Sequence, residues 1–252
     1  MKNIAFLFIL NFVLYSCSND DNNNIPENVP VTFQFSQNWN GDAVDKTDFN
    51  STTYTNDIGN VLTISKLRYL ISKIQLKKSD GTLIEIDGYN LVDLSEEGSL
   101  EMTPSSIPTG DYIGISFIYG FNEEDNSNVY PDLNVALWNW PTMLGGGYHF
   151  MQMEGSFLDS NGAPQPYAYH NGTARVSQGV FEQNFISFDF NQNFTITNNA
   201  TIEIKMNIAE WYKNPYQWDL NVFSTDLMMN YEAQKHMNDN GQSVFSIGSI
   251  TQ

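Results

Sequence analysis

The stretch LTISKLRYLISKIQL, residues 62–76, decides the fold class. Its second half, from Leu70 onward, alternates between two sets of residues, as a β-strand with one face in a core does. Asp80-Gly81 follows as a strong hairpin signal, and LIEI at 83–86 supplies the return strand. A long strand with an immediate return predicts an antiparallel sheet.

Further short strands, separated by turn signals, are expected on both sides of this stretch. They cover residues 31–35, 90–94, 111–119, 148–157, 185–190 and 201–207. Helical signals are few. The best covers 231–239, where Ala233, Gln234 and Met237 share a face and Gly241 acts as a stop. We therefore predict an all-β fold, an antiparallel β-sandwich with a short C-terminal helix.

An irregular insertion rich in tryptophan and glycine, between Phe121 and Gly147, interrupts the strand pattern. It contains Trp138-Asn139-Trp140-Pro141 and ends in a triple glycine, and a turn of helix is expected within 133–140. Two interpretations of the tryptophans stay open. They form a platform for a sugar or line a ligand pocket, or they belong to a flap that packs over the sandwich.

Residues 1–16 have the pattern of a signal peptide. Lys2 precedes an apolar run that ends at Tyr15 and is too short to span a bilayer comfortably as a mature helix. Ser16 then precedes Cys17, the one cysteine in the chain, and this arrangement resembles the lipobox of bacterial lipoproteins. We expect cleavage before Cys17 and a diacylglycerol on its sulfur, which anchors the protein in the outer membrane.

Residues 17–28 are expected to form a lipidated, disordered tether, because SNDDNNN at 18–24 is polar, acidic and free of hydrophobic residues. An acidic stretch directly after a lipidated cysteine resembles the surface-export signal of Bacteroidota lipoproteins. It favours the cell surface over the alternative, the periplasmic face of the outer membrane. Residues 29–252 then form a single domain without an internal repeat.

Composition narrows the classes of function. A formal net charge of −18 argues against nucleic acid as a partner, since phosphates repel an acidic surface. The single cysteine excludes an intramolecular disulfide and a cysteine-cluster zinc site. There is no Gly-x-Ser-x-Gly or His-Glu-x-x-His motif, and no pair of carboxylates stands out, so we expect no enzyme.

The three histidines, His149, His170 and His236, are the strongest candidate metal ligands. Imidazole is the commonest side-chain ligand of late first-row metals. His149 and His170 lie on different expected strands in aromatic surroundings, so they could converge on one ion. The alternative is that each is a half-buried strand residue bonded to backbone. His236 is expected on the surface of the helix.

Calcium is a second candidate ion, because hard cations take oxygen ligands from loops. The candidate ligands are Asp45, Asp48, Glu123, Glu124 and Asp125. The run Glu123-Glu124-Asp125-Asn126 lacks the spacing of an EF-hand, and the alternative is a solvated acidic loop.

The order of motifs along the chain resembles the MbnP-like family, named for a copper-binding protein encoded with methanobactin genes and common among Bacteroidota lipoproteins. The matching elements are FQFSQNWNG (33–41), YTNDIG (54–59), LRYLISKIQL (67–76), YNLVD (89–93), IPTGDY (107–112), FIYGFN (117–122), WNW (138–140), GYHFMQMEG (147–155) and YH (169–170). No single element is specific to the family, but their order is.

The resemblance implies a mononuclear copper site, with Cu(I) held by histidines and a tryptophan that a partner dihaem enzyme of the MauG type oxidises to kynurenine. In this chain the resemblance implies that His170 is a ligand and that Trp138 or Trp140 is the tryptophan that is oxidised. Many members have a histidine where this chain has Gln37. Because an amide oxygen is a poor ligand for a soft ion, either the site is lost or His149 supplies the missing nitrogen.

Together these features predict a cell-surface lipoprotein that binds copper for uptake or handling. Its expected partners are the outer membrane and either a MauG-like dihaem enzyme or an outer-membrane transporter. The alternative is a non-catalytic module without a metal that binds a glycan or a protein. That alternative expects Trp138 and Trp140 to be exposed and unmodified.

Overall fold

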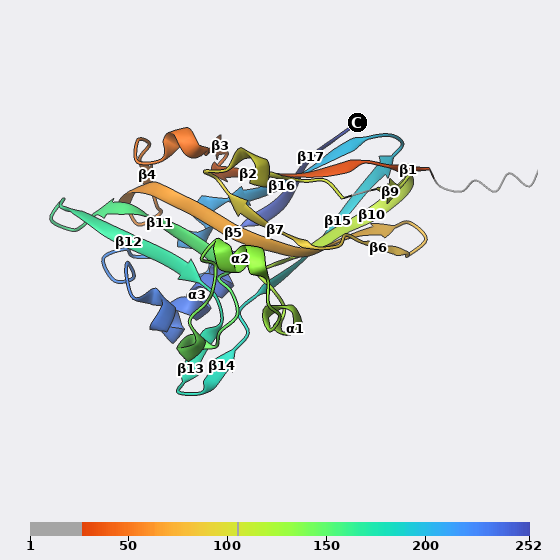
Figure 1. Ribbon diagram of the computed structural model, residues 1–252. Coiled ribbons are helices and arrows are strands. Elements are labelled where there is room, and N and C mark those ends of the chain that lie inside the picture. The colour runs from red at the N-terminus through yellow and green to blue at the C-terminus, as the bar shows by residue number, and fades with distance from the viewer. Residues whose placement is uncertain (1–26, 105) are drawn as a thin grey trace, which may run out of the picture.

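The computed structural model describes residues 27–104 and 106–252 as two packed β-sheets, with the three α-helices in the lower part of the view of Figure 1. The expected signal peptide, Cys17 and most of the expected tether lie outside these residues. Strands dominate the described chain, so the predicted all-β sandwich is confirmed. No helix among the described residues is long and apolar enough to cross a membrane.

The larger sheet is built around β5 (Val61–Lys78), which contains the stretch that the sequence singles out. The first half of β5 pairs with β11 (Met151–Leu158), and its second half pairs with β10 (Gly110–Tyr119). β12 (Pro164–Asn171) and β15 (Ile186–Ile196) complete the order β12-β11-β5-β10-β15. Three short strands also pair with β5: β4 (Tyr54–Thr55), β6 (Leu83–Glu85) and β7 (Tyr89–Asp93).

The second sheet has the order β17-β16-β2-β3, with β8 also on β2. Its strands are β2 (Val31–Trp39), β3 (Asp42–Ala43), β8 (Glu101–Met102), β16 (Ala200–Asn207) and β17 (Phe245–Thr251). β2 and β16 run parallel, and the other pairs in this sheet are antiparallel. Two small ladders join β1 (Asn28–Val29) to β9 (Ile107–Pro108) and β13 (Ala174–Ser177) to β14 (Val180–Glu182).

Aromatic rings fill the space between the two sheets. Phe245 of the second sheet packs at centroid distances of 5.1 Å from Phe188 and 5.5 Å from Phe117, both in the larger sheet. Met151 and Met153 of β11 are fully buried in the same core. These two methionines therefore pack in the core.

The insertion is irregular, as predicted, but its details differ from the expectation. The helical turn is α2 (Pro131–Val135), which begins at Pro131 because proline suits the first helical turn. Residues 138–140 are extended instead, and Asn139 forms an isolated bridge with Tyr148. The insertion packs on Leu70 through a small second core of Phe121, Leu133, Trp138 and Tyr148.

The remaining helical elements are short. The predicted C-terminal helix is α3 (Tyr231–Gly241), and it buries Ala233, Gln234 and Met237 as the spacing indicates. The others are α1 (Glu123–Asn126), η1 (Lys46–Asp48), η2 (Glu97–Ser99), η3 (Thr142–Leu144), η4 (Ile208–Tyr212) and η5 (Leu227–Met229).

Candidate metal centre

Four aromatic side chains that the sequence singled out meet on the face of the larger sheet that lies away from the main core. The rings of His149 and His170 have centroids 5.3 Å apart and are nearly perpendicular. The ring of Trp140 lies 4.9 Å from that of His149, and the ring of Trp138 lies 5.5 Å from it. The structure thus brings together the two predicted ligands and both predicted modifiable positions.

Strand register explains why His170 points to this face. Gln152 of β11 lies opposite Arg68 of β5 and opposite His170 of β12, so the three form one row across the sheet. Side chains alternate between the two faces of a sheet, and the neighbouring Met151 and Met153 therefore point into the main core. The structure does not bring these two thioethers to the histidine pair.

Short backbone contacts hold the two tryptophans beside His149. The His149 amide donates to the Trp138 carbonyl at 2.9 Å, and the Trp140 amide donates to the Gly147 carbonyl at 2.9 Å. A Cβ on Gly172, just after β12, would lie 2.6 Å from the Trp140 ring. The absence of a side chain at that glycine lets Trp140 pack against the end of β12.

His170 is oriented by a carboxylate. Its Nε2 lies 3.0 Å from Glu154 Oε1, and the same oxygen accepts a hydrogen bond from Lys66 Nζ at 2.9 Å. A carboxylate on one ring nitrogen fixes the imidazole orientation and makes the other nitrogen more basic, as it does around many bound metals. The second nitrogen of His170, Nδ1, is then the one left to meet a metal.

His149 is the more unusual of the pair. Its side chain is buried, and its Nδ1 has no hydrogen-bond partner among the described residues. Burial, helped by His170 and the nearby cations, lowers the pKa of His149 to about 3. A buried polar atom without a partner costs free energy, so a bound cation at this nitrogen would remove a penalty.

The pKa of His170 is also lowered, chiefly by burial, while its hydrogen bond to Glu154 opposes the shift. Both rings are therefore neutral at neutral pH, the protonation state in which imidazole binds metals. Two neutral imidazoles, one with an unpartnered nitrogen, fit a soft late transition metal such as copper.

Arg68 supports the tryptophan side of this site. Its guanidinium lies 4.8 Å from the centroid of the Trp138 ring and donates to Gln152 Oε1 at 2.9 Å. Asp93 lies 3.7 Å away and offsets its charge. Because Arg68 and Lys66 each face a carboxylate, the positive charge around the histidines is largely balanced.

Both tryptophans are buried, with Trp138 0% exposed and Trp140 2% exposed. Of the two interpretations left open, this burial contradicts a sugar-stacking platform and agrees with a flap that packs on the sandwich. The Trp138 ring packs in the small core beneath the insertion together with Leu70, and the Arg68 guanidinium lies over it.

Gln37, the position at which the resemblance raises a doubt, is not near the histidine pair. It lies on β2 in the second sheet, and its Nε2 donates to Tyr69 Oη inside the main core at 2.7 Å. Tyr69 is the β5 neighbour of Arg68 and points to the opposite face. His236 is also elsewhere, because it stacks on Tyr216 at 3.7 Å.

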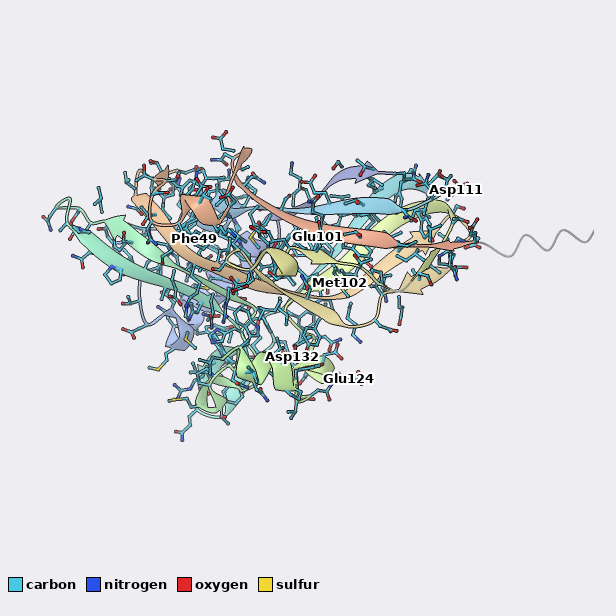
Figure 2. The ribbon with its side chains drawn as sticks, turned by 45° about the horizontal axis from the view of Figure 1, so that its top comes forward. Phe49, Glu101, Met102, Asp111, Glu124 and Asp132 are labelled. Atoms are coloured by element: carbon cyan, nitrogen blue, oxygen red, sulfur yellow. The ribbon has the colours of Figure 1, made fainter. Side chains whose placement is uncertain are left out.

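The calcium candidates fall into two separate groups with structural roles. Asp45 and Asp48 close the capping box of η1, and Asp125 pairs with Lys73 at 3.2 Å. Figure 2 shows acidic residues spread over the molecule, with the candidate Glu124 near the helices and Asp111 at the far end of the sheets. Across residues 27–104 and 106–252, no group of three His, Cys, Asp or Glu side chains is placed to hold a metal ion.

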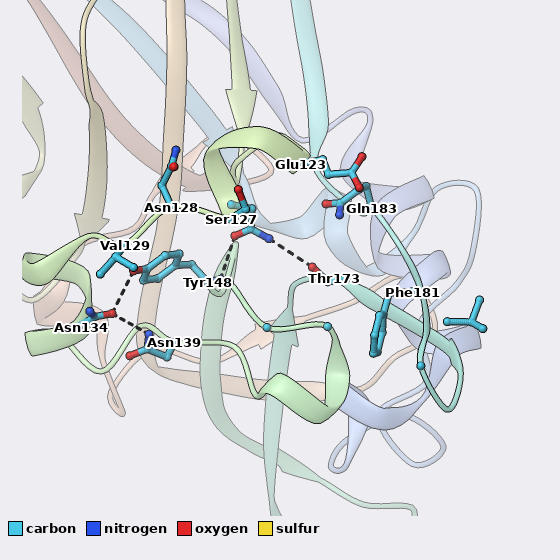
Figure 3. Close-up of a pocket in the computed structure, with 16 residues that line it drawn as sticks. Glu123, Ser127, Asn128, Val129, Asn134, Asn139, Tyr148, Thr173, Phe181 and Gln183 are labelled. Carbon is cyan, nitrogen blue, oxygen red and sulfur yellow. Dashed lines mark hydrogen bonds between the residues drawn. The ribbon is translucent and has the colours of Figure 1, made fainter.

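A wide cleft of about 720 Å³ lies beside the tryptophan segment, and Figure 3 shows its lining. The side-chain amides that line it form hydrogen bonds with neighbouring residues. Asn134 Oδ1 accepts from Tyr148 Oη at 3.1 Å and from Asn139 at 2.7 Å, and Asn126 Oδ1 accepts from the Tyr148 amide at 2.9 Å. Sequence reasoning missed this cleft, because its residues come from segments far apart in the chain.

The protein is thus a β-sandwich that carries the buried His149 and the half-buried His170 beside two tryptophans. The MbnP family model matches residues 28–230, and the chain belongs to the MbnP family. The solved structure of MbnP from Methylosinus trichosporium resembles it with a TM-score of 0.57 at 13% identity, over 88% of this chain and 99% of that chain. At that identity the likeness shows a shared fold. No curated protein matches the sequence.

The buried histidine makes the stability of the metal-free protein depend on pH. Because the folded-state pKa of His149 is about 3 and its ordinary value is 6.5, the unfolded chain binds a proton that the folded chain does not between these limits. We expect the wild type to lose stability relative to His149→Gln by up to about 1.4 kcal/mol for each pH unit below 6.5. Urea unfolding of both proteins across this range measures the effect. If the free energy of unfolding of the two proteins changed with pH in the same way, the burial of His149 would be contradicted.

Proposed function

We propose that this protein binds a single Cu(I) ion between His149 and His170, for copper uptake or handling outside the cytoplasm. The observation that carries the proposal is the buried, unpartnered Nδ1 of His149, in a ring 5.3 Å from that of His170. Membership of a family named for a copper-binding protein supports it.

The surroundings favour a soft monovalent cation. Imidazole suits copper, and two neutral imidazoles add no charge to the site. Lys66 and Arg68 lie nearby, and the part of their charge that Glu154 and Asp93 leave unbalanced repels a divalent cation more than a monovalent one. Glu154 holds the His170 ring in place, and Trp140 covers His149, so bulk water has little access to His149. Bound copper would be the cargo that the protein takes up or hands on.

The copper proposal predicts that the soluble domain takes up one equivalent of Cu(I) from a competing chelator. His149→Ala/His170→Ala should lose this uptake, because no other imidazole lies at the site. Glu154→Gln should weaken it by about 10-fold or more, because the ring orientation is lost. His236→Ala is the matched control, since His236 stacks on Tyr216 away from the site, and it should bind as the wild type does. Equal uptake by the wild type and the double variant would refute the proposal.

We also propose that a partner dihaem enzyme of the MauG type oxidises Trp138 or Trp140 to kynurenine. Both rings lie within 5.5 Å of the His149 ring, so an oxygen-bearing product there would stand beside the metal. In protein purified from its native host, the peptide that contains Trp138 and Trp140 should differ in mass from the unmodified peptide, and the corresponding peptide of a Trp138→Phe/Trp140→Phe variant should have its unmodified mass. An unmodified mass in the presence of the partner enzyme would contradict this part.

The anchor is proposed to be a diacylglycerol on Cys17, with the domain at the outer surface of the outer membrane. The lipobox-like pattern and the acidic residues after it support this address. We expect a palmitate analogue to label the wild type but not Cys17→Ala. Protease added to intact cells should degrade the wild type. If the lipidated protein on intact cells resisted the protease, it would lie on the periplasmic face of the outer membrane instead.

A second candidate function is a metal-free module that binds a glycan or a protein. The wide amide-lined cleft of Figure 3 is the observation that favours it, together with the half-exposed Phe181 at its edge. Metal analysis of natively expressed protein separates the two candidates, because this module carries no copper.

A further inference from the structure

A cavity of about 390 Å³ shares His170 with the metal centre, and three methionines line it: Met143, Met228 and Met229. Met143 is 64% exposed and Met229 is 58% exposed. Methionine is most often buried, as Met151, Met153, Met206 and Met237 are in this protein. Core packing therefore does not explain Met143 and Met229, and Met228 is only half-buried.

The segment that carries Met143 is attached to the tryptophan beside His149. Met143 is the middle residue of η3, which follows Trp140-Pro141 directly. Trp140 Nε1 donates to the Leu144 carbonyl at 3.1 Å, so the indole that covers His149 also holds the end of η3. Met143 is thus placed on the rim of the cavity by a residue of the site itself.

The segment that carries Met228 and Met229 is attached to the strand of His170. The fully buried Gln234 of α3 donates from Nε2 to the His170 carbonyl at 2.7 Å and to the Leu227 carbonyl at 3.1 Å. The Ala168 amide of β12 donates to the Ser224 carbonyl at 2.7 Å. Two segments far apart in sequence are therefore held so that their methionines surround the same opening.

We propose that Met143, Met228 and Met229 form a capture site for Cu(I) in front of the histidine pair, an inference that rests on the proposed copper function. Thioether sulfur is a soft neutral ligand that selects Cu(I) over hard cations. The exposed Asp226 on the same rim supplies a negative charge that attracts a cation. During transfer the ion stays Cu(I), as each bond to sulfur breaks while a bond to imidazole nitrogen forms.

Binding at the methionines is tested in the mature protein with isotope-labelled methionine methyl groups. The probe is Ag(I), a redox-inert substitute for Cu(I), added to His149→Ala/His170→Ala. We expect the methyl resonances of Met143, Met228 and Met229 to shift, and those of Met102 and Met206 to stay. Shifts spread evenly over all methionines, or no shifts, would overturn the capture site. Since the histidines are absent, this result does not depend on the histidine site.

The role in capture is tested by loading kinetics. Met143→Leu/Met228→Leu/Met229→Leu keeps the apolar volume but removes the sulfurs, so the fold should be unchanged. We expect it to reach the wild-type Cu(I) occupancy several-fold more slowly, while Met102→Leu loads at the wild-type rate. Loading of the triple variant at the wild-type rate would show that the methionines serve another purpose, such as packing against a partner protein. Failure of the histidine proposal would appear differently, as a wild type that takes up no more Cu(I) than the double histidine variant.

Discussion

The pairing of β11 between β5 and β12 is the constraint on which the rest of the site depends. Its register places Gln152 in one row with Arg68 and His170, and Glu154 opposite Lys66. A slip of one residue would exchange the two faces of the strand. The methionines of β11 would then leave the core, and Gln152 and Glu154 would lose their partners on the outer face.

Burial and charge pairing act together around this row. Arg68 and Lys66 face Asp93 and Glu154, so the charges near the histidines are largely balanced without help from the imidazoles. The tryptophan flap then removes water from His149 and keeps its ring neutral. Unpartnered and uncharged, His149 is suited to the proposed copper ion, and the methionine-lined cavity beside His170 is the proposed route for that ion from solvent.

The sequence predicted the sandwich well, because alternation along residues 62–76 and the turn signals around it are local properties. It also indicated that His149 and His170 could converge. It could not predict the burial of Trp138, which depends on Arg68 and Leu70 from a distant strand. Nor could it show that Met143 and Met228 line one cavity, since tertiary contacts alone bring these residues together.

The central claim is that His149 and His170 together hold one copper ion. Anomalous diffraction at the copper edge, from crystals of the loaded protein, tests it most directly. The account predicts a single strong peak within bonding distance of a ring nitrogen of both histidines. A peak elsewhere, or none at the histidine pair in a protein that has taken up copper, would contradict it.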